Sequence, residues 1–171
     1  MVLCELSYVD FSKVLTQGDP LGMTLFSLGE NFSINDTYKL CNLYGGHEDF
    51  VLNVCKTKRF KNIMVRNFCE IFDESTNAQY SSVEFAINEK TSFIAFRGTD
   101  NSIVGWKEDF MISFTRIKSQ DYAKKYLQDV MKDGKEYYIG GHSKGGNLAM
   151  YACAWLSEER REQILHIYDF D

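Results

Sequence analysis

Residues 137–149 read YYIGGHSKGGNLA, and the fold expected for the whole chain follows from this stretch. Its apolar start, glycine-rich centre and helix-forming end predict a strand, a very tight turn and a helix in direct succession. Ser143 lies in the middle of a G-x-S-x-G pattern, with Gly141 and Gly145 two positions away on either side. This is the pattern of a nucleophile elbow, where a serine in strained backbone angles leaves no room for a Cβ atom on the two glycines.

A second short motif predicts the other half of a site for acyl transfer. The strand expected at residues 91–96 is followed by Gly98 and Thr99. An oxyanion on an attacked carbonyl needs two backbone donors: the N–H after the serine, here that of Lys144, and one from the loop after a neighbouring strand. Gly98 lets the backbone approach a substrate, and Thr99 can add its hydroxyl to its N–H. The N-terminus of the elbow helix would favour the same negative charge.

Hydrophobic periodicity predicts helices in the first part of the chain. Apolar residues recur at helical spacing in residues 2–15 and 48–57, and Asp36 can cap a short helix over residues 36–44. Residues 16–35 hold several glycines and the single proline, and they read as loop with a helical turn near Leu25.

The period then changes from helix to strand. Residues 68–72 look extended, apolar residues alternate over 82–88, and residues 91–96 form a nearly continuous apolar run. A turn-like segment separates the last two runs. We therefore expect an antiparallel hairpin over residues 83–96 that leads into the centre of a sheet.

Helices and strands alternate from there on. Residues 120–132 form an amphipathic helix, with Ser119 as N-cap and Gly134 as C-terminal stop. Three elements are expected after the elbow turn: a helix over 145–155, a short polar helix over 157–163 and a last strand over 164–170. Such alternation requires crossovers and parallel pairing. The sequence thus predicts an α/β fold with a mainly parallel central sheet, an antiparallel hairpin and helices on both faces.

Composition bounds the class of protein. A chain of 171 residues with 44% hydrophobic residues suffices for one domain. We expect residues 1–171 to be that domain, with a helical part at 1–62 and the sheet-and-elbow core at 63–171. The net charge of −5 gives no electrostatic basis for binding nucleic acid or an anionic membrane, and no apolar stretch approaches the length that spans a bilayer.

The cysteines give no sign of a disulfide framework or a metal site. Their number, five, is odd, and none forms a C-x-x-C pair. Buried free thiols in a reducing cytoplasm fit this pattern, so we expect a cytoplasmic protein. The glycine-rich turn also lacks the G-x-x-x-x-G-K-[ST] spacing of a phosphate loop. We expect neither a metal nor another cofactor.

The two motifs together resemble the α/β-hydrolases of the class 3 (fungal-type) lipase group. The resemblance is carried by FRGT at 96–99, by Trp106-x-x-Asp109-Phe110 and by GHSKGG at 141–146. Nearly the whole chain is similar to a bacterial family of lipase-like proteins of unassigned function. The resemblance implies a three-layer α/β-hydrolase sandwich, a serine nucleophile at Ser143 and an oxyanion hole at Thr99 and Lys144. It implies that Trp106 and Asp109 support the oxyanion loop from behind.

The sequence departs from this group after the nucleophile. Such enzymes follow the serine with an acid and then a histidine, whereas here His166 precedes Asp169 and Asp171. His166 also falls within the last expected strand and not on a loop. We therefore expect the chain to be a fragment, cut at both ends, with the triad acid and histidine in the missing C-terminal portion.

Two neighbours of the serine have simpler expected roles. His142 would point away from the nucleophile as a packed, hydrogen-bonded residue. The side chain of Lys144 would face solvent, with only its main chain serving the site.

The sequence supports two hypotheses about function. The first is a serine hydrolase that cleaves a carboxylic ester or related acyl bond in a small-molecule or lipid-like substrate. The alternative is a non-catalytic binding or regulatory module that keeps a hydrolase scaffold. In either case a fragment with an open sheet edge is expected to self-associate.

Overall fold

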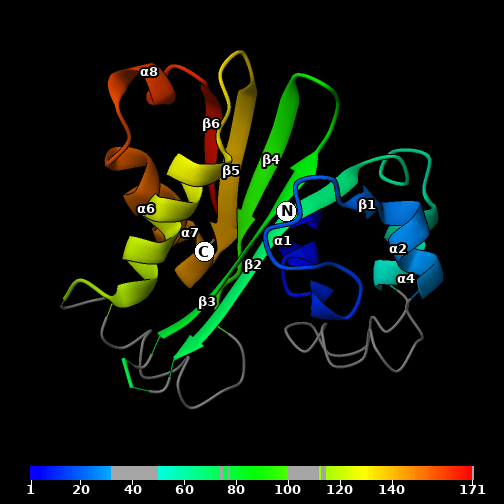
Figure 1. Ribbon diagram of the computed structural model, residues 1–171, viewed down its shortest axis with the longest axis horizontal. Coiled ribbons are helices and arrows are strands. Elements are labelled where there is room, and N and C mark those ends of the chain that lie inside the picture. The colour runs from blue at the N-terminus through cyan, green and yellow to red at the C-terminus, as the bar shows by residue number, and fades with distance from the viewer. Residues whose placement is uncertain (32–49, 74, 77, 100–111, 113–114, 171) are drawn as a thin grey trace.

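The computed structural model describes residues 1–31, 50–73, 75–76, 78–99, 112 and 115–170 (Figure 1). Within them the chain forms an α/β fold with six strands in one sheet, ordered β1 to β6 as in the sequence. The strands are β1 Met23–Thr24, β2 Met64–Asp73, β3 Ala78–Ala86, β4 Thr91–Phe96, β5 Glu136–His142 and β6 Ile164–Phe170.

The sheet is mixed, which corrects the expectation of a mainly parallel one. Strands β1 to β4 pair antiparallel, and only β4, β5 and β6 run parallel. The reason lies in the connections, because four residues join β3 to β4, and a link this short can join only antiparallel neighbours. The two parallel pairs are joined through helices, as their crossovers require. The predicted hairpin is confirmed, with Ser82 opposite Phe96 and Ala86 opposite Ser92.

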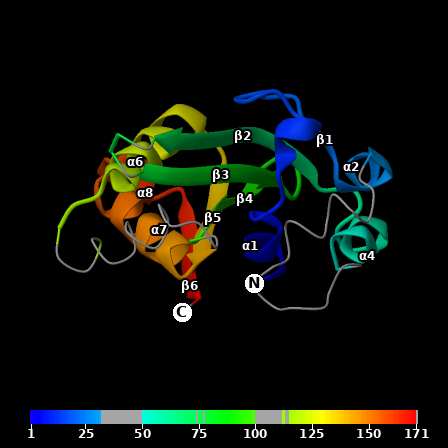
Figure 2. The same cartoon turned by 90° about the horizontal axis from the view of Figure 1, so that it is seen from below.

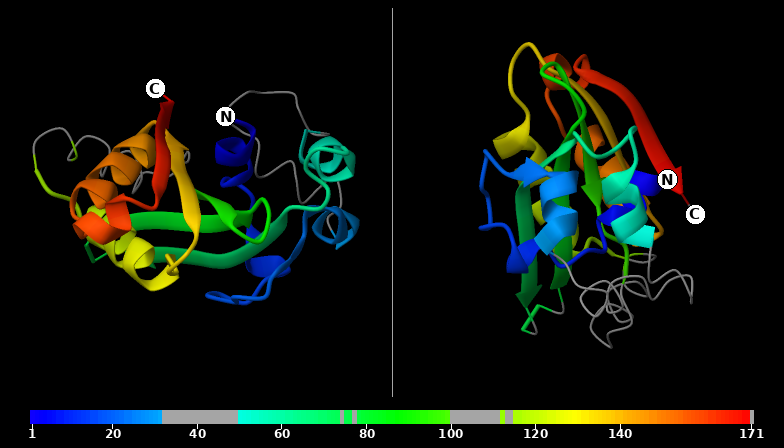
Figure 3. Two further views of the ribbon diagram at one scale, coloured as in Figure 1. Left: turned by 90° about the horizontal axis from the view of Figure 1, so that it is seen from above. Right: turned by 90° about the vertical axis from the view of Figure 1, so that its right-hand side faces the viewer.

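Helices cover both faces of the sheet. One face carries α1 Val2–Leu6, the 3₁₀ helix η1 Phe11–Lys13, α2 Leu25–Asn31 and α4 Phe50–Lys56. The other carries α6 Lys118–Val130, α7 Lys144–Ala154 and α8 Glu158–Arg161. Figures 2 and 3 show α1 and α7 on opposite sides of β5. None of the helices within the described ranges has the length and apolar character needed to cross a membrane.

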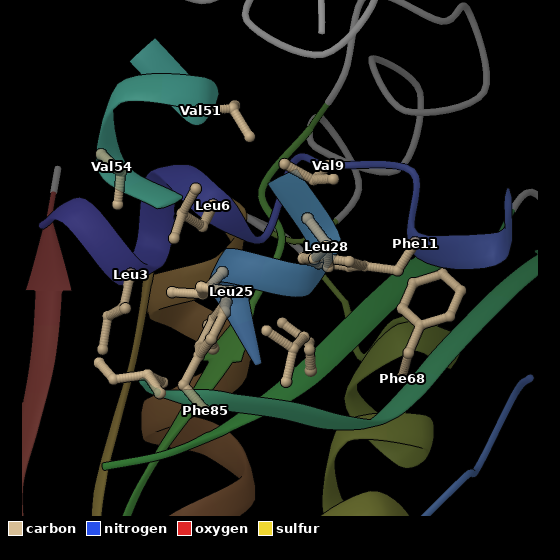
Figure 4. Packing of buried hydrophobic residues seen from close by; sticks show 14 of the residues in the cluster. Leu3, Leu6, Val9, Phe11, Leu25, Leu28, Val51, Val54, Phe68 and Phe85 are labelled. Carbon is tan, nitrogen blue, oxygen red and sulfur yellow. The ribbon is translucent and has the colours of Figure 1, made fainter. Parts of the chain in front are cut away.

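The core has one part on each face. On the first face, leucines of α1 and α2 and valines of α4 belong to one buried cluster with Phe68 and Phe85 of the sheet (Figure 4). On the second face, α6 and α7 pack against Ile94, Phe96 and Ile139. Every residue of β3 is therefore buried, including the polar ones that the alternating sequence pattern placed on a separate face.

Several helices differ from the sequence expectation in their bounds, and the stretch expected to be helical over 2–15 is divided into α1 and η1. Helix α6 begins after Ile117, whose N–H donates to the side-chain oxygen of Gln120 at 3.2 Å. Ser119, the expected N-cap, instead donates its hydroxyl to the carbonyl of Gln79 at 3.3 Å. Gly134 lies in the turn that follows the helix, with φ of 74°. The single turn expected near Leu25 is the helix α2, and the helix expected over 36–44 lies outside the described residues.

The four cysteines within the described ranges are free thiols. Cys4, Cys55 and Cys153 are buried, and Cys69 is partly buried. Burial raises the pKa of Cys4 and Cys153 to about 12 and that of Cys55 to about 11. Thiols with such pKa values are poor nucleophiles at neutral pH, so these three residues serve packing.

Candidate active site

The predicted strand, tight turn and helix are present around Ser143. Strand β5 ends at His142 and α7 begins at Lys144, so Ser143 alone makes the turn. Its backbone takes φ of 53° and ψ of −124°, angles that a residue with a Cβ atom adopts only when its surroundings enforce them. The surroundings are β6 and α7: the N–H of Ser143 donates to Phe170 O at 2.9 Å, and its carbonyl accepts from Gly146 N at 2.8 Å.

The glycines on either side of Ser143 permit very close backbone packing. A Cβ atom on Gly145 would lie 2.2 Å from the carbonyl oxygen of Phe96, and one on Gly141 would lie 2.3 Å from the carbonyl carbon of Gly145. The first turn of α7 therefore lies directly on the backbone of β4 and β5. This contact explains why the pattern needs glycine at both positions.

The second motif lies against the same turn. Phe96 is the register partner of Gly141, so the residues after β4 run beside the elbow. A Cβ atom on Gly98 would lie 2.4 Å from the carbonyl oxygen of His142. The hydroxyl oxygen of Thr99 is buried and has no hydrogen-bond partner among the described residues. An unsatisfied buried hydroxyl costs about 1–3 kcal/mol, so Thr99 presents an unused donor close to the elbow.

An ion pair fixes the start of this loop. The guanidinium of Arg97 lies 2.7 Å from a carboxylate oxygen of Glu70 on β2, and Arg97 is buried. The backbone N–H of Arg97 also donates to Ser81 O at 2.9 Å, and this bond continues the β3–β4 ladder by one residue. The loop thus leaves the sheet in a fixed direction before it reaches Gly98 and Thr99.

His142 is packed and hydrogen-bonded, as the sequence predicted. Its Nδ1 atom lies 3.3 Å from the hydroxyl of Tyr8, and the two rings meet edge to face with centroids 6.4 Å apart. Burial raises the pKa of nearby Glu5, and the charge of His142 partly opposes this effect. Sequence reasoning missed Tyr8, because nothing local connects it with a motif 134 residues away.

The side chain of Lys144 does not face solvent, and this expectation was wrong. Lys144 is only 3% exposed, and its Nζ donates to the carbonyl oxygen of Gln79 at 2.9 Å. The elbow directs the first residue of α7 across the sheet, toward the beginning of β3. The same carbonyl accepts the hydroxyl of Ser119, so it joins α6, α7 and β3.

A Lys144→Ala variant is expected to lose about 2 kcal/mol of unfolding free energy, because it removes a buried charge-assisted hydrogen bond and leaves a cavity. Urea denaturation measures this loss. Lys132→Ala is the matched control, since Lys132 also donates its Nζ to a carbonyl, that of Asp129 at 3.0 Å, but is exposed. The control should change stability by less than about 0.5 kcal/mol. Equal, small effects of both variants would contradict the buried role of Lys144.

Some residues singled out in the sequence are not brought to Ser143. His166 is exposed on β6 and is the register partner of Tyr138, five residues before the serine and hence about 16 Å away along the strand. Its ring lies against Tyr168 instead, with centroids 4.5 Å apart. Trp106, Asp109 and Asp171, which the sequence analysis also named, lie outside the described residues.

The described residues include no second histidine that could replace His166. His142 is engaged with Tyr8 on the α1 face of the sheet, so neither described histidine is placed to take a proton from Ser143. Asp169 lies close to the site, since a Cβ atom on Gly146 would meet its carboxylate oxygen. Among all the residues that the structure describes, no three His, Cys, Asp or Glu side chains gather as metal ligands would.

Comparison with known proteins gives one family match. A family model described as Mbeg1-like matches residues 54–171. Among solved structures, the crystal structure of M37 lipase is similar at 21% sequence identity, with a TM-score of 0.39. That alignment covers 98% of this chain and 57% of the lipase chain, so this chain spans little more than half the lipase's length. None of the curated proteins compared matches this chain.

Proposed function

We propose that this chain, which belongs to the Mbeg1-like family, carries the nucleophile and oxyanion hole of a serine hydrolase with an α/β-hydrolase fold. The reaction would be cleavage of a carboxylic ester or related acyl bond. One observation carries the proposal: Ser143 is held at φ of 53° between a strand and a helix N-terminus. Strain of this kind is expected where a side chain must be presented for chemistry.

The described residues would act at the carbonyl in a defined order. The Oγ of Ser143 gives its proton to a base outside the described residues and forms a bond to the acyl carbon, while the carbonyl π electrons move onto the oxygen. The N–H groups of Lys144 and Thr99 would hold that oxyanion, helped by the N-terminus of α7 and by the Thr99 hydroxyl. Collapse of the intermediate expels the alcohol, which takes up the proton, and water then hydrolyses the acyl-serine.

Other residues would support these groups without touching the substrate. Gly98, Gly141 and Gly145 let the two loops approach each other, and His142 anchors the turn on the α1 face. The base and its orienting acid would come from outside the described residues, in keeping with the expectation of a C-terminal acid and histidine. Trp106 and Asp109 remain a prediction as the segment behind the oxyanion loop.

The substrate would be a small acyl ester or lipid-like molecule.

The hydrogen bond between Lys144 and Gln79 holds the proposed donor N–H in place, because that N–H and the hydrogen-bonded side chain belong to the same residue. Fixed donors of this kind stabilise charge that develops in the transition state, since they need no reorganisation when the charge forms.

Labelling with a fluorophosphonate tests the proposal on the natural polypeptide that contains this chain. We expect the wild type to be labelled and Ser143→Ala to lose labelling by a factor of about 10³ or more. Ser157→Ala is the matched serine control and should label like wild type, since Ser157 caps α8 away from the elbow. Equal labelling of wild type and Ser143→Ala would refute the assignment of the nucleophile.

The alternative is a non-catalytic binding or regulatory module on the same scaffold. The positions of His142 and His166 favour it, because neither described histidine is placed to serve Ser143. The same experiment separates the two functions: a wild-type protein that folds but is not labelled at Ser143 would be such a module.

A further inference from the structure

We infer that Tyr8 is a positioning residue for the proposed oxyanion hole, because its hydroxyl lies between the two loops that would supply the two donors. The inference deepens the proposed function and rests on it for its kinetic consequence. Its structural part, that Tyr8 holds the two loops together, can be tested without any activity.

The contacts of the Tyr8 hydroxyl reach both loops. On one side it lies 3.3 Å from Nδ1 of His142, the residue before the nucleophile. On the other side it covers Gly98, since a Cβ atom built there would lie 2.3 Å from the hydroxyl oxygen. With a bond of about 1.5 Å between Cα and Cβ, the hydroxyl is within about 3.8 Å of the Gly98 Cα. The hydroxyl is thus wedged between the oxyanion loop and the elbow.

The carbonyl of His142 takes part in the same contact. It would lie 2.4 Å from the Cβ position on Gly98, next to the Tyr8 hydroxyl. The residues that follow these two contact points are Thr99 and Ser143, so a shift of either loop moves a proposed catalytic group. A misplacement of about 1 Å in a reacting group can cost about 10²-fold in rate.

Tyr8 is itself held by burial and by its link to helix α1. It is 7% exposed, and its N–H donates to Glu5 O at 3.1 Å at the end of α1. Leu3 and Leu6 of α1 point into the core shared with α2, α4 and Phe85 (Figure 4). Helix α1 also contacts β4 and β5, the strands that lead into the two loops. A hydroxyl fixed in this way can resist motion of Gly98 relative to His142.

The position of Tyr8 gives the first part of the chain a role in the site. The family model covers residues 54–171, so Tyr8 lies outside the matched segment. The segment before it would therefore contribute more than core packing: it would set the distance between the two proposed donors.

Tyr8→Phe tests the inference, because it keeps the ring and removes only the hydroxyl. Hydrogen exchange is measured on peptides covering 97–99 and 142–146, and kcat and KM are measured with a p-nitrophenyl ester on the natural polypeptide. We expect exchange to quicken at least fivefold in both peptides, kcat to fall about tenfold and KM to stay within twofold. A merely structural residue would not separate kcat from KM in this way.

Tyr126→Phe is the matched control. Tyr126 is also 7% exposed, and its hydroxyl donates to Asn67 O at 2.8 Å, so the variant loses a buried hydroxyl elsewhere. It should leave exchange in both peptides and kcat unchanged.

The outcomes separate this inference from the proposed function. Unchanged exchange in Tyr8→Phe overturns the positioning role, whether or not an ester is cleaved. Quickened exchange with kcat unchanged, or with KM raised instead, also overturns it. Quickened exchange in a protein that cleaves no ester supports the structural part of the inference, that Tyr8 holds the two loops together. That outcome contradicts only the proposed hydrolase function.

Discussion

A Gly145→Ala variant is expected to lose about 3 kcal/mol of unfolding free energy and to disrupt the elbow. The added Cβ atom would lie 2.2 Å from Phe96 O and 3.0 Å from Phe96 C, both backbone atoms of a central strand. Such atoms cannot rotate away as a flexible side chain would, so α7 must move off the sheet. Overpacking a core typically costs 1–3 kcal/mol, and a contact this short belongs at the upper end. Urea denaturation would measure the loss.

Gly134→Ala provides the control for this variant. Gly134 has φ of 74° and open space around its Cβ position, so alanine there suffers only backbone strain. That strain is about 1–2 kcal/mol for an L-residue in the left-handed region. A larger loss for Gly134→Ala than for Gly145→Ala would show that close packing of α7 on β4 is not what requires glycine at position 145.

Local patterns in the sequence predicted the elements nearest the site well. The strands at 91–96 and 164–170 have the bounds that the structure shows, because continuous apolar runs between turn residues allow little choice. The elbow could be predicted from the sequence because close backbone contacts require glycine two positions before and two positions after Ser143. A local sequence pattern therefore suffices when the physical constraint is also local.

Long-range partners could not be read in the same way. Lys144 is buried because a carbonyl 65 residues away accepts its ammonium, and no pattern around Lys144 signals this. Tyr8 reaches His142 across 134 residues. The mixed sheet was misjudged for a related reason: the sequence analysis predicted one antiparallel pairing, that of the hairpin over 83–96, and assigned no partner to the strand expected at 68–72.

Replacement of Glu84 by alanine is expected to lose about 3–5 kcal/mol of unfolding free energy. Glu84 is buried in β3 and accepts hydrogen bonds from Arg66, Asn67 and Ser92, each at 2.6 Å. Removing it leaves three donors without their acceptor, including a partly buried guanidinium. Breaking one partner of a buried ion pair costs about this amount because the remaining charge is uncompensated. Chemical denaturation at neutral pH measures the loss.

An exposed control variant and a double variant together identify the source of the lost stability. Asp129→Asn removes a carboxylate from an exposed pair with Lys125, and should cost less than about 0.5 kcal/mol. If the unpaired Arg66 charge dominates, Arg66→Met combined with Glu84→Gln should be more stable than Glu84→Gln alone. A double variant less stable than Glu84→Gln would place the cost in the lost packing instead.

The same network predicts how stability depends on pH. Burial alone would raise the pKa of Glu84, but hydrogen bonds from Arg66, Ser92 and Asn67 together with the charge of Arg66 hold it below its ordinary value of 4.5. Since the pKa is lower in the folded than in the unfolded chain, the stabilisation is complete above the unfolded value and is lost as pH falls through the folded one. As pH falls below about 5, wild type should therefore lose stability more steeply than Glu84→Gln. Identical slopes of unfolding free energy against pH in the two proteins would mean that Glu84 does not titrate differently on folding.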